Sequence, residues 1–318
     1  MHEVKRPLTV TVVVLTYNQS EFILDCLQGI LKQETRAAIE LIISDDASTD
    51  NTPEKIREWT GKFFPSAQVV LRDKNVGVAR NWLETISLAK GKYVALCEGD
   101  DYWIDSGKLE KQVEILEKYP EINLCWHEVE ILEQGIFRKH PYAPLKGQVS
   151  GIREAIQNHS IPTCSMLFRN QETWNWPSFF FSAFSIDVLV QLEVLQTGNA
   201  FKADGKMAVY RQHPGGVSKH PKQFWHSALN RMEMLVQFDS HSQGKYNETV
   251  RHFVSREASI LLKYADLPVL SKHRVRLIRL LWFGKKPSTF KEKREWVYLT
   301  FFPKYYDQFL LWRQGKRI

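Results

Sequence analysis

The sequence is poor in cysteine, with four among 318 residues and no two spaced as Cys-x-x-Cys. This shortage argues against a disulfide framework and against a zinc site, because both need cysteines at defined close spacings. The four residues stand mostly among apolar neighbours, which is typical of buried free thiols in a reducing cytoplasm. They are Cys26, Cys97, Cys125 and Cys164.

Long hydrophobic runs are also missing. No stretch approaches the roughly 18 apolar residues of a membrane-spanning helix. The apolar segment 9–15 is too short and too rich in β-branched residues for a secretory signal. Hydrophobic residues make up 43% and charged residues 25% of the chain, as in a globular protein. We expect a cytoplasmic protein, free or peripheral on the inner face of the cytoplasmic membrane.

Several widespread motifs of phosphate and nucleophile chemistry are absent. No Gly-x-Gly-x-x-Gly follows the first apolar segment, so the usual dinucleotide-binding loop is excluded. The chain also lacks a Walker A loop, a Gly-x-Ser-x-Gly elbow and a His-Glu-x-x-His helix. Any active site must therefore be built from other groups.

Positive charge is concentrated at the C-terminal end, where residues 271–318 hold 13 Lys and Arg against 3 Asp and Glu. Basic and apolar side chains alternate there, which suits either an interfacial helix on an anionic membrane or a solvated face of a core-packed helix. Nucleic acid is not expected as a partner, because no recognised motif accompanies the charge. The residues concerned are Arg274, Arg276, Arg279, Lys285 and Lys286, with Leu280, Leu281, Trp282 and Phe283.

The first 127 residues alternate strand and helix patterns. Uniformly apolar or β-branched runs predict buried strands, and apolar residues at helical spacing predict the helices between them. Repeated strand–helix units with short connections predict an α/β fold with a mostly parallel central sheet flanked by helices. The expected strands are 9–15, 40–44, 68–72, 92–97 and 122–127, and a helix is expected over 108–119. Residues 128–220 look less regular, and the chain beyond residue 221 looks helical.

Four polar clusters each come directly after an expected strand: 16–18, 45–51, 72–77 and 98–101. In parallel sheets, ligands bind outside the carboxyl ends of the strands. We therefore expect the four clusters to face one cleft. An ionised Asp45 or Asp46 accepts hydrogen bonds from a base or ribose, Gly77 permits close backbone approach, and Arg80 suits a phosphate.

The stretch CEGDDYW (97–103) places three carboxylates within four residues. Two carboxylates about 4 Å apart repel by about 4 kcal/mol at an effective dielectric constant near 20. The stretch is therefore either a solvated surface turn or a site for a hard divalent cation, which keeps substrate phosphates among its ligands. With the other clusters it describes a nucleotide-diphosphate site holding Mn²⁺ or Mg²⁺.

The ordered segments VTVVVLTYNQSEFILDCLQG, IELIISDDASTDNT, NVGVARNW and GKYVALCEGDDYW resemble the family 2 glycosyltransferases with the GT-A fold. The resemblance is dense over residues 8–127 and looser to about 220. It implies a bacterial enzyme of capsule, O-antigen or lipopolysaccharide synthesis. Implied donor-binding residues are Thr16, Tyr17, Asn18, Asp45, Asp46, Asn75, Gly77, Arg80, Glu98, Gly99 and Arg211, and implied metal-site residues are Asp100, Asp101 and His213. Glu98 stands where the family usually has Asp.

The later segment FSIDVLVQLEVLQTGNAFKADGKMAVYRQHPGGVS resembles the family's catalytic segment and makes Asp187 the candidate general base. The implied reaction inverts the anomeric centre in one displacement, with the acceptor hydroxyl losing its proton to Asp187. The expected donor is a UDP-sugar, and the expected acceptor is a lipid-linked or lipopolysaccharide glycan.

Other interpretations of these residues stay open. Asp45 and Asp46 suit a helix cap or Asx turn, and Asp187 suits a helix cap. Arg80 suits an ordinary helix surface, and His213 a hydrogen-bonded loop residue. Trp174 and Trp176 suit either the core or a platform for an acceptor sugar.

The expected organisation is a catalytic domain over 1–220, with a nucleotide-sugar half (8–127) and an acceptor half (128–220), followed by a helical basic region (221–318). The alternatives are a sugar-phosphate nucleotidyltransferase, which would need a Gly-rich basic loop after the first strand, and an inactive membrane-surface scaffold.

Overall fold

The computed structural model describes residues 9–138, 147–158, 161–216, 224–264, 276, 277, 279, 280 and 283. The chain divides into two compact units, Met1–Lys219 and His220–Ile318. The division falls beside the boundary expected at residue 220. The functional halves of the first unit stay predictions.

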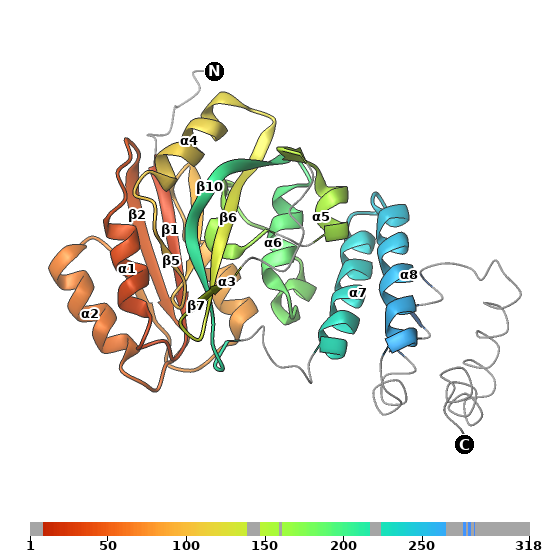
Figure 1. Ribbon diagram of the computed structural model, residues 1–318, viewed down its shortest axis with the longest axis horizontal. Helices are drawn as coiled ribbons and strands as arrows, with labels where there is room; N and C mark the ends of the chain where they lie inside the picture. The colour runs from red at the N-terminus through yellow and green to blue at the C-terminus, as the bar shows by residue number, and fades with distance from the viewer. Residues whose placement is uncertain are drawn as a thin grey trace, which may run out of the picture. The chain divides into compact units, whose positions relative to one another are not determined.

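A single mixed sheet forms the centre of the first unit (Figure 1). The order of its main strands is β3-β2-β1-β4-β9-β6-β10-β5, with β7 paired to β6 and β8 to β10. Its strands are β1 (Thr9–Thr16), β2 (Ala38–Asp45), β3 (Gln68–Leu71), β4 (Tyr93–Glu98), β5 (Tyr102–Trp103), β6 (Ile122–Glu133), β7 (Ile136–Arg138), β8 (Val149–Ser150), β9 (Leu167–Arg169) and β10 (Asn199–Gln212).

The helices of this unit connect the strands. They are α1 (Ile23–Leu31), α2 (Thr52–Phe63), α3 (Val78–Ile86), α4 (Lys108–Lys118), α5 (Ile152–Asn158) and α6 (Ile186–Val194), with two 3-10 helices, η1 (Thr163–Ser165) and η2 (Ser178–Ser182). The predicted strands and the helix over 108–119 agree with the observed bounds to within a residue or two, except that β6 extends beyond the predicted 122–127.

The parallel part of the sheet consists of β3, β2, β1 and β4, in which each pair of neighbours is parallel. β9 is antiparallel to both β4 and β6, and it links the parallel part to the parallel pair β6 and β10. The α/β class with a mostly parallel sheet is therefore confirmed. Residues 128–220 are more regular than predicted, because β6 and β10 pair along almost their whole length. The charged residues at the less buried positions of these two strands had obscured the strand pattern in the sequence.

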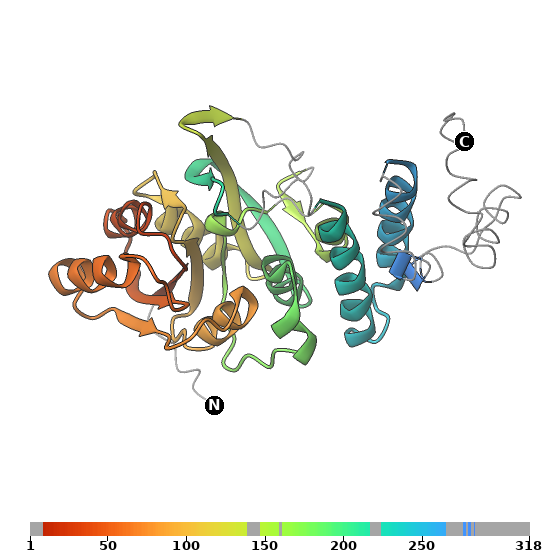
Figure 2. The same ribbon diagram turned by 90° about the horizontal axis from the view of Figure 1, so that it is seen from below.

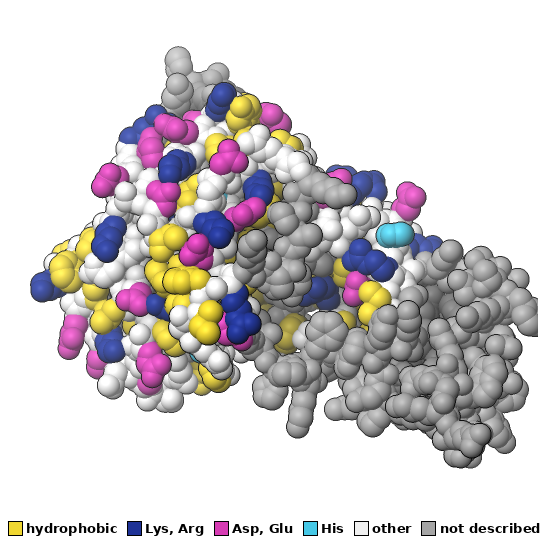
Figure 3. Space-filling model, in the orientation of Figure 1, with side chains coloured by type: hydrophobic (Ala, Val, Ile, Leu, Met, Phe, Trp, Pro, Cys, Tyr) yellow, Lys and Arg dark blue, Asp and Glu magenta, His cyan; other side chains and the backbone are white. Residues whose placement is uncertain are grey.

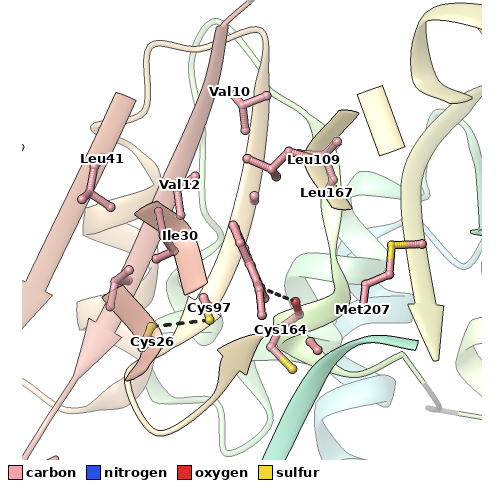
Figure 4. Close-up of a cluster of buried hydrophobic side chains, with 14 of the residues drawn as sticks. Val10, Val12, Cys26, Ile30, Leu41, Cys97, Leu109, Cys164, Leu167 and Met207 are labelled. Carbon is pink, nitrogen blue, oxygen red and sulfur yellow. Dashed lines mark hydrogen bonds between the residues drawn. The ribbon is translucent and has the colours of Figure 1, made fainter. Parts of the chain in front are cut away.

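Helices cover both faces of the sheet (Figure 2). On one face, α1, α2 and α4 share an apolar cluster with alternate residues of β1, among them Val10 and Val12 (Figure 4). The period-2 alternation of a strand sends the intervening residues to the face covered by α3. All four cysteines are buried and free, as predicted. Two of them meet in this cluster, where the Sγ atoms of Cys26 and Cys97 are 3.6 Å apart.

Two titratable side chains lie in the core beside this cluster. Lys108 is fully buried, donates to Gln112 Oε1 at 2.7 Å and lies 4.1 Å above the Trp103 ring. Burial lowers the Lys108 pKa to about 8. His127 is also fully buried, and burial together with the Lys108 charge lowers the His127 pKa to about 3. His127 is therefore neutral at physiological pH.

The second unit contains α7 (Phe224–His241) and α8 (Asn247–Tyr264), which confirms the helical pattern predicted there. Asp239 accepts hydrogen bonds from the Tyr246 backbone and the Asn247 side chain, which fixes the turn between the two helices. Arg276 forms a two-bond ion pair with Glu233, so this basic residue is engaged inside its own unit. Arg274, Leu281, Trp282, Lys285 and Lys286 lie outside the described residues.

Within the described parts of the chain, the helices are too short or too polar to cross a membrane. Basic and acidic side chains are interspersed over the face of the described residues seen in Figure 3.

Candidate active site

The carboxyl ends of four parallel strands meet at one edge of the sheet. Thr16 at the end of β1 pairs with Asp45 at the end of β2, and Leu15 pairs with Glu98 at the end of β4. β3 ends at Leu71, also opposite Asp45. The four polar clusters therefore lie side by side, because buried apolar strands fix where each loop begins.

Hydrogen bonds join the loop after β1 to the loop after β2. Asn18 has a left-handed backbone, with φ 53°, and its Oδ1 accepts the Thr49 N–H at 2.8 Å. The Asn18 N–H donates to Ser48 Oγ at 2.7 Å. Thr16 is buried, whereas Tyr17 is 46% exposed. Tyr17 and Asn18 are therefore the two of these three residues that offer side-chain surface to a ligand.

Asp45 and Asp46, the first acid pair, are both buried and receive donors from the protein itself. The Ser48 N–H and Oγ–H donate to the two carboxylate oxygens of Asp45, at 2.8 and 2.5 Å. The backbone N–H groups of Val76 and Gly77 donate to Asp46 at 2.8 and 3.0 Å. Burial raises the Asp45 pKa, and the Ser48 bonds oppose that rise. Asp45 thus closes an Asx-type turn, and Asp46 holds the chain at the start of α3.

The loop that Asp46 holds contains two more residues that are predicted to bind the nucleotide-sugar donor, Asn75 and Gly77. Asn75 donates to the Asp46 carbonyl at 3.1 Å and accepts the Gly77 N–H at 3.1 Å. Gly77 has φ 88°, which favours glycine. Arg80 follows in the first turn of α3. It is exposed, pairs with Glu84 at 3.1 Å and lies 5.2 Å from the Phe181 ring, so it has both surface access and a packing role.

Glu98, Asp100 and Asp101, the second acid cluster, differ sharply from one another in surroundings. Asp100 is only partly buried, and its Oδ2 lies 3.1 Å from His213 Nε2. Asp101 is fully buried, and its Oδ1 accepts the Arg211 backbone N–H at 2.9 Å. Its Oδ2 has no oxygen or nitrogen donor among the described residues, and the weakly polar Cys164 thiol is its neighbour.

Electrostatics sets this cluster apart from the first acid pair. Burial, and next the charge of Asp100, raises the pKa of both Glu98 and Asp101 well above the ordinary range. The charge of Asp187 adds to the rise for Glu98, and a hydrogen bond with Thr163 opposes it. Asp187 lies in the first turn of α6 and is partly buried. The two sequence-distant acids are thus electrostatically coupled at this site.

Arg211 is engaged by the protein on every side. Its guanidinium lies 4.4 Å from the Tyr102 ring and 5.1 Å from the Phe22 ring, forms an ion pair with Asp25 and donates to the Asp100 carbonyl at 3.0 Å. The predicted phosphate contact would have to displace one of these partners. In its present surroundings Arg211 positions the backbone of Asp100.

The residues at the end of β4 can be tested for their fit to a divalent ion. Asp100 and His213 offer one carboxylate and one imidazole to the same point, and Phe22 packs on the His213 ring at 4.7 Å. Within the described residues no group of three His, Cys, Asp or Glu side chains has metal-site geometry. Two protein ligands with the rest supplied by phosphate oxygens and water suit Mg²⁺ or Mn²⁺. The surroundings of Asp101 instead favour a positioning role.

An aromatic segment leads from β9 to Asp187. Trp174 and Trp176 stack on each other with ring centroids 4.4 Å apart. Their indole N–H groups donate to Asn170 Oδ1 and Ser87 Oγ, both at 2.9 Å. One face of each ring is therefore used within the protein, which favours the packing interpretation of this pair.

Three residues that were not predicted lie beside the second acid cluster and its partners: Phe22, Asp25 and Thr163. Phe22 and Asp25 belong to the predicted helix after β1, where their spacing suggested only a helix face. Their partners are Arg211 on β10 and His213 directly after it, nearly 190 residues later in the chain. No local signal in the sequence reveals such a contact.

Residues 11–174 match the model of Glycosyl transferase family 2, which is slightly more than half of the chain. An uncharacterized protein of Mycobacterium bovis is 34% identical over 219 residues, which cover 69% of this chain and 61% of that protein. The Escherichia coli glucosyltransferase WfaP, named for UDP-Glc and an α-D-GlcNAc-diphosphoundecaprenol acceptor, is 32% identical over 111 residues, covering 34% of this chain and 41% of WfaP.

Among solved structures, S. aureus TarS 1–349 in complex with UDP-GlcNAc superposes with a TM-score of 0.68 at 15% identity, covering 97% of this chain and 92% of that chain. At this identity the likeness shows the fold alone, which is the GT-A fold. The family match over residues 11–174, by contrast, establishes that the chain belongs to glycosyl transferase family 2.

Proposed function

We propose that this glycosyltransferase transfers a sugar with inversion from a UDP-sugar to a lipid-linked glycan in bacterial surface-polysaccharide synthesis. The observation that carries the proposal is the Asp100–His213 pair, at 3.1 Å, at the same sheet edge as the loops ending β1 and β2. The donor and acceptor named for WfaP support the UDP-sugar and the lipid carrier. TarS with UDP-GlcNAc supports a uridine nucleotide.

The donor would lie across this edge. The base would contact Tyr17 and the first acid pair, and the diphosphate would lie at Asp100 and His213. A bound Mn²⁺ or Mg²⁺ would neutralise the negative charge that develops on the departing diphosphate. Arg211 and the buried Asp101 hold the chain on either side of Asp100, so this carboxylate is preorganised.

The proposed chemical step gives Asp187, in the first turn of α6, the role of general base. The acceptor hydroxyl oxygen forms a bond to the anomeric carbon while the bond from that carbon to the diphosphate breaks. The proton of the hydroxyl passes to the Asp187 carboxylate, which acts as general base. No covalent sugar–enzyme intermediate is needed, so the anomeric configuration inverts.

Family membership favours the transferase over the nucleotidyltransferase alternative. An inactive scaffold would be expected to lack its acids, and Asp100 and Asp187 are both present. The predicted membrane contact of the C-terminal region remains a proposal of its own. Deletion of 271–318 should reduce co-sedimentation with anionic liposomes if that region is interfacial.

Calorimetry of UDP with Mn²⁺ tests the donor site. Asp100→Ala and His213→Ala should each weaken metal-dependent UDP binding by at least about tenfold, whereas Asp187→Asn should keep it and lose sugar transfer. Asp204→Ala, an exposed acid on β10, is the matched control and should behave as the unaltered protein. Undiminished binding in both site variants would overturn the metal assignment, and an active Asp187→Asn would remove the base assignment.

A further inference from the structure

The space between the loop after β1 and the second acid cluster is closed by the side chain of Gln19. Gly99 lies between the two, and its N–H donates to the Leu15 carbonyl at 2.9 Å. A Cβ atom at Gly99 would lie 2.5 Å from Gln19 Oε1 and 3.0 Å from Thr16 Oγ1. The missing side chain of Gly99 therefore makes room for the polar ends of Gln19 and Thr16.

These two polar ends are unpaired. Thr16 Oγ1 and Gln19 Oε1 are both buried and have no hydrogen-bond partner in the part of the chain that the structure describes. Thr16 is only 3% exposed. Buried polar groups in native proteins are nearly always hydrogen-bonded, and an unpaired one is destabilising. Two such atoms facing the same glycine indicate a ligand that supplies the missing hydrogen bonds.

The neighbouring groups are, by contrast, well bonded. The Gln19 N–H donates to Thr52 Oγ1 at 2.9 Å, and its carbonyl accepts from Phe22 and Ile23 at the start of α1. The backbone of Gln19 is therefore fixed, and only its amide is left without a partner. Gln19 as a whole is half-buried, so its side chain also reaches the surface.

The chemical class of the ligand follows from the two groups on either side of Gly99, which are the loop after β1 and Asp100. A nucleoside diphosphate carries its groups in the order base, ribose, diphosphate. If the base lies at the loop after β1 and the diphosphate at Asp100, as in the proposed function on which this inference rests, the ribose lies over Gly99. Ribose hydroxyls both donate and accept, so they can pair with an amide and with a threonine hydroxyl.

We propose that Gln19, assisted by Thr16, hydrogen-bonds the ribose diol of the donor and makes the enzyme select ribonucleotide over deoxyribonucleotide donors. A site built to hydrogen-bond a hydroxyl rejects the analogue that lacks it, because the polar groups of the protein are then left unpaired. UDP-sugars and GDP-sugars would be accepted on this basis, and dTDP-sugars disfavoured.

The test compares UDP, 2′-deoxy-UDP and 3′-deoxy-UDP by calorimetry with Mn²⁺, using the full chain. The unaltered protein should bind at least one deoxy analogue about tenfold more weakly than UDP, as expected for one lost hydrogen bond. Gln19→Leu, which keeps the size but not the amide, should bind UDP about tenfold more weakly and lose most of that preference. Gln68→Leu, an exposed glutamine at the start of β3, is the matched control.

The outcomes separate this inference from the proposed function. If the unaltered protein binds all three nucleotides equally, or if Gln19→Leu keeps the full preference, the ribose assignment is wrong although the UDP site stands. If no nucleotide binds with Mn²⁺ or Mg²⁺, the proposed donor itself is wrong. Thr16→Val provides a second variant should Gln19→Leu fail to fold. It should also lose part of the preference for UDP over the deoxy analogue, but a smaller part than Gln19→Leu loses.

Discussion

The first acid pair and the second acid cluster follow parallel strands on either side of β1, yet their carboxylates have very different hydrogen-bond partners. Around Asp45 and Asp46, each carboxylate oxygen has a donor from Ser48, Val76 or Gly77. Around Glu98 and Asp100 the nearest charged groups include further acids, and the pKa of Glu98 is raised well above normal. In the first acid pair every carboxylate oxygen has a donor from the protein, whereas the second acid cluster brings acids together without a matching set of donors, as the proposed cation site requires.

The comparison shows why a run of acids after a strand is an ambiguous signal. A carboxylate that accepts backbone N–H groups stabilises the loop, and it can still present its remaining lone pairs to a ligand. A carboxylate that faces other carboxylates stabilises nothing by itself. Selection for stability alone would remove the second arrangement, so its presence points to function.

The largest expected effect comes from replacing one Asp by Asn in each of the two acid clusters. Asp100→Asn should lower sugar transfer by about 100-fold or more, equivalent to about 2.7 kcal/mol of transition-state stabilisation, and leave stability unchanged or higher. Asp46→Asn should destabilise the protein by about 1–3 kcal/mol, because an amide has one acceptor oxygen for two N–H donors. Urea unfolding and initial rates of UDP release measure the two effects.

Asp73→Asn is the control for this pair, since Asp73 is an exposed acid at the same sheet edge. The contrast between the two clusters fails if Asp100→Asn is as destabilising as Asp46→Asn. It also fails if Asp46→Asn leaves stability untouched, because the loop at Val76 and Gly77 would then not depend on the carboxylate.

A smaller effect is expected within the second cluster, at Asp101. Asp101→Asn retains an oxygen for the Arg211 N–H and removes a buried charge, so UDP–Mn²⁺ affinity should fall by less than about tenfold. Asp101→Ala leaves that N–H unpaired and should destabilise by about 1–3 kcal/mol. Calorimetry and urea unfolding separate the two. If Asp101→Asn abolishes binding as fully as Asp100→Ala, Asp101 is a metal ligand and the positioning role is wrong.

Much of the loop arrangement at this edge of the sheet was predictable from the sequence, because apolar runs mark the buried strands directly. The apolar run before Thr16 and the run before Glu98 fix the ends of β1 and β4, and the parallel pairing then brings their loops together. The side-chain environments were not predictable. Asp100 and Asp101 are adjacent in sequence, but one lies against His213 and the other is enclosed against Arg211.

The partners from β10 explain what the sequence could not supply. The family resemblance implied Arg211 as a donor-binding residue, which stays a prediction. In the structure its guanidinium has two aromatic rings and Asp25 as neighbours. Such a choice depends on which rings and acids the fold brings near it. The register of β10 against β6 and β5, which local pattern does not encode, decides that.

The smallest expected effect is on the pH dependence of stability. It can be measured only after a third titratable group, His127, has been removed. The raised pKa of Asp101 means that the folded protein holds this proton more tightly, so its contribution to stability falls as the pH rises above about 4. His127 acts in the opposite sense. Its pKa is about 3 when folded and near 6.5 when unfolded, so its contribution falls as the pH drops from about 6.5. At pH 5 this loss is about 2 kcal/mol relative to pH 7.

The expected result is therefore that His127→Phe removes the His127 share of the pH dependence, so that lowering the pH from 7 to 5 costs about 2 kcal/mol less unfolding free energy than in the unaltered protein, measured by urea unfolding in EDTA. The lost bond from His127 Nδ1 to the Glu128 carbonyl lowers stability equally at both pH values, so the pH difference isolates the titration. Adding Asp101→Asn in this background should reduce the remaining slope, because one of the two acids with a raised pKa, Asp101 and Glu98, is gone. If the unfolding free energy of the His127→Phe variant changes between pH 7 and pH 5 as it does in the unaltered protein, other groups dominate the pH dependence. The two acid clusters could then not be compared through the pH dependence of stability.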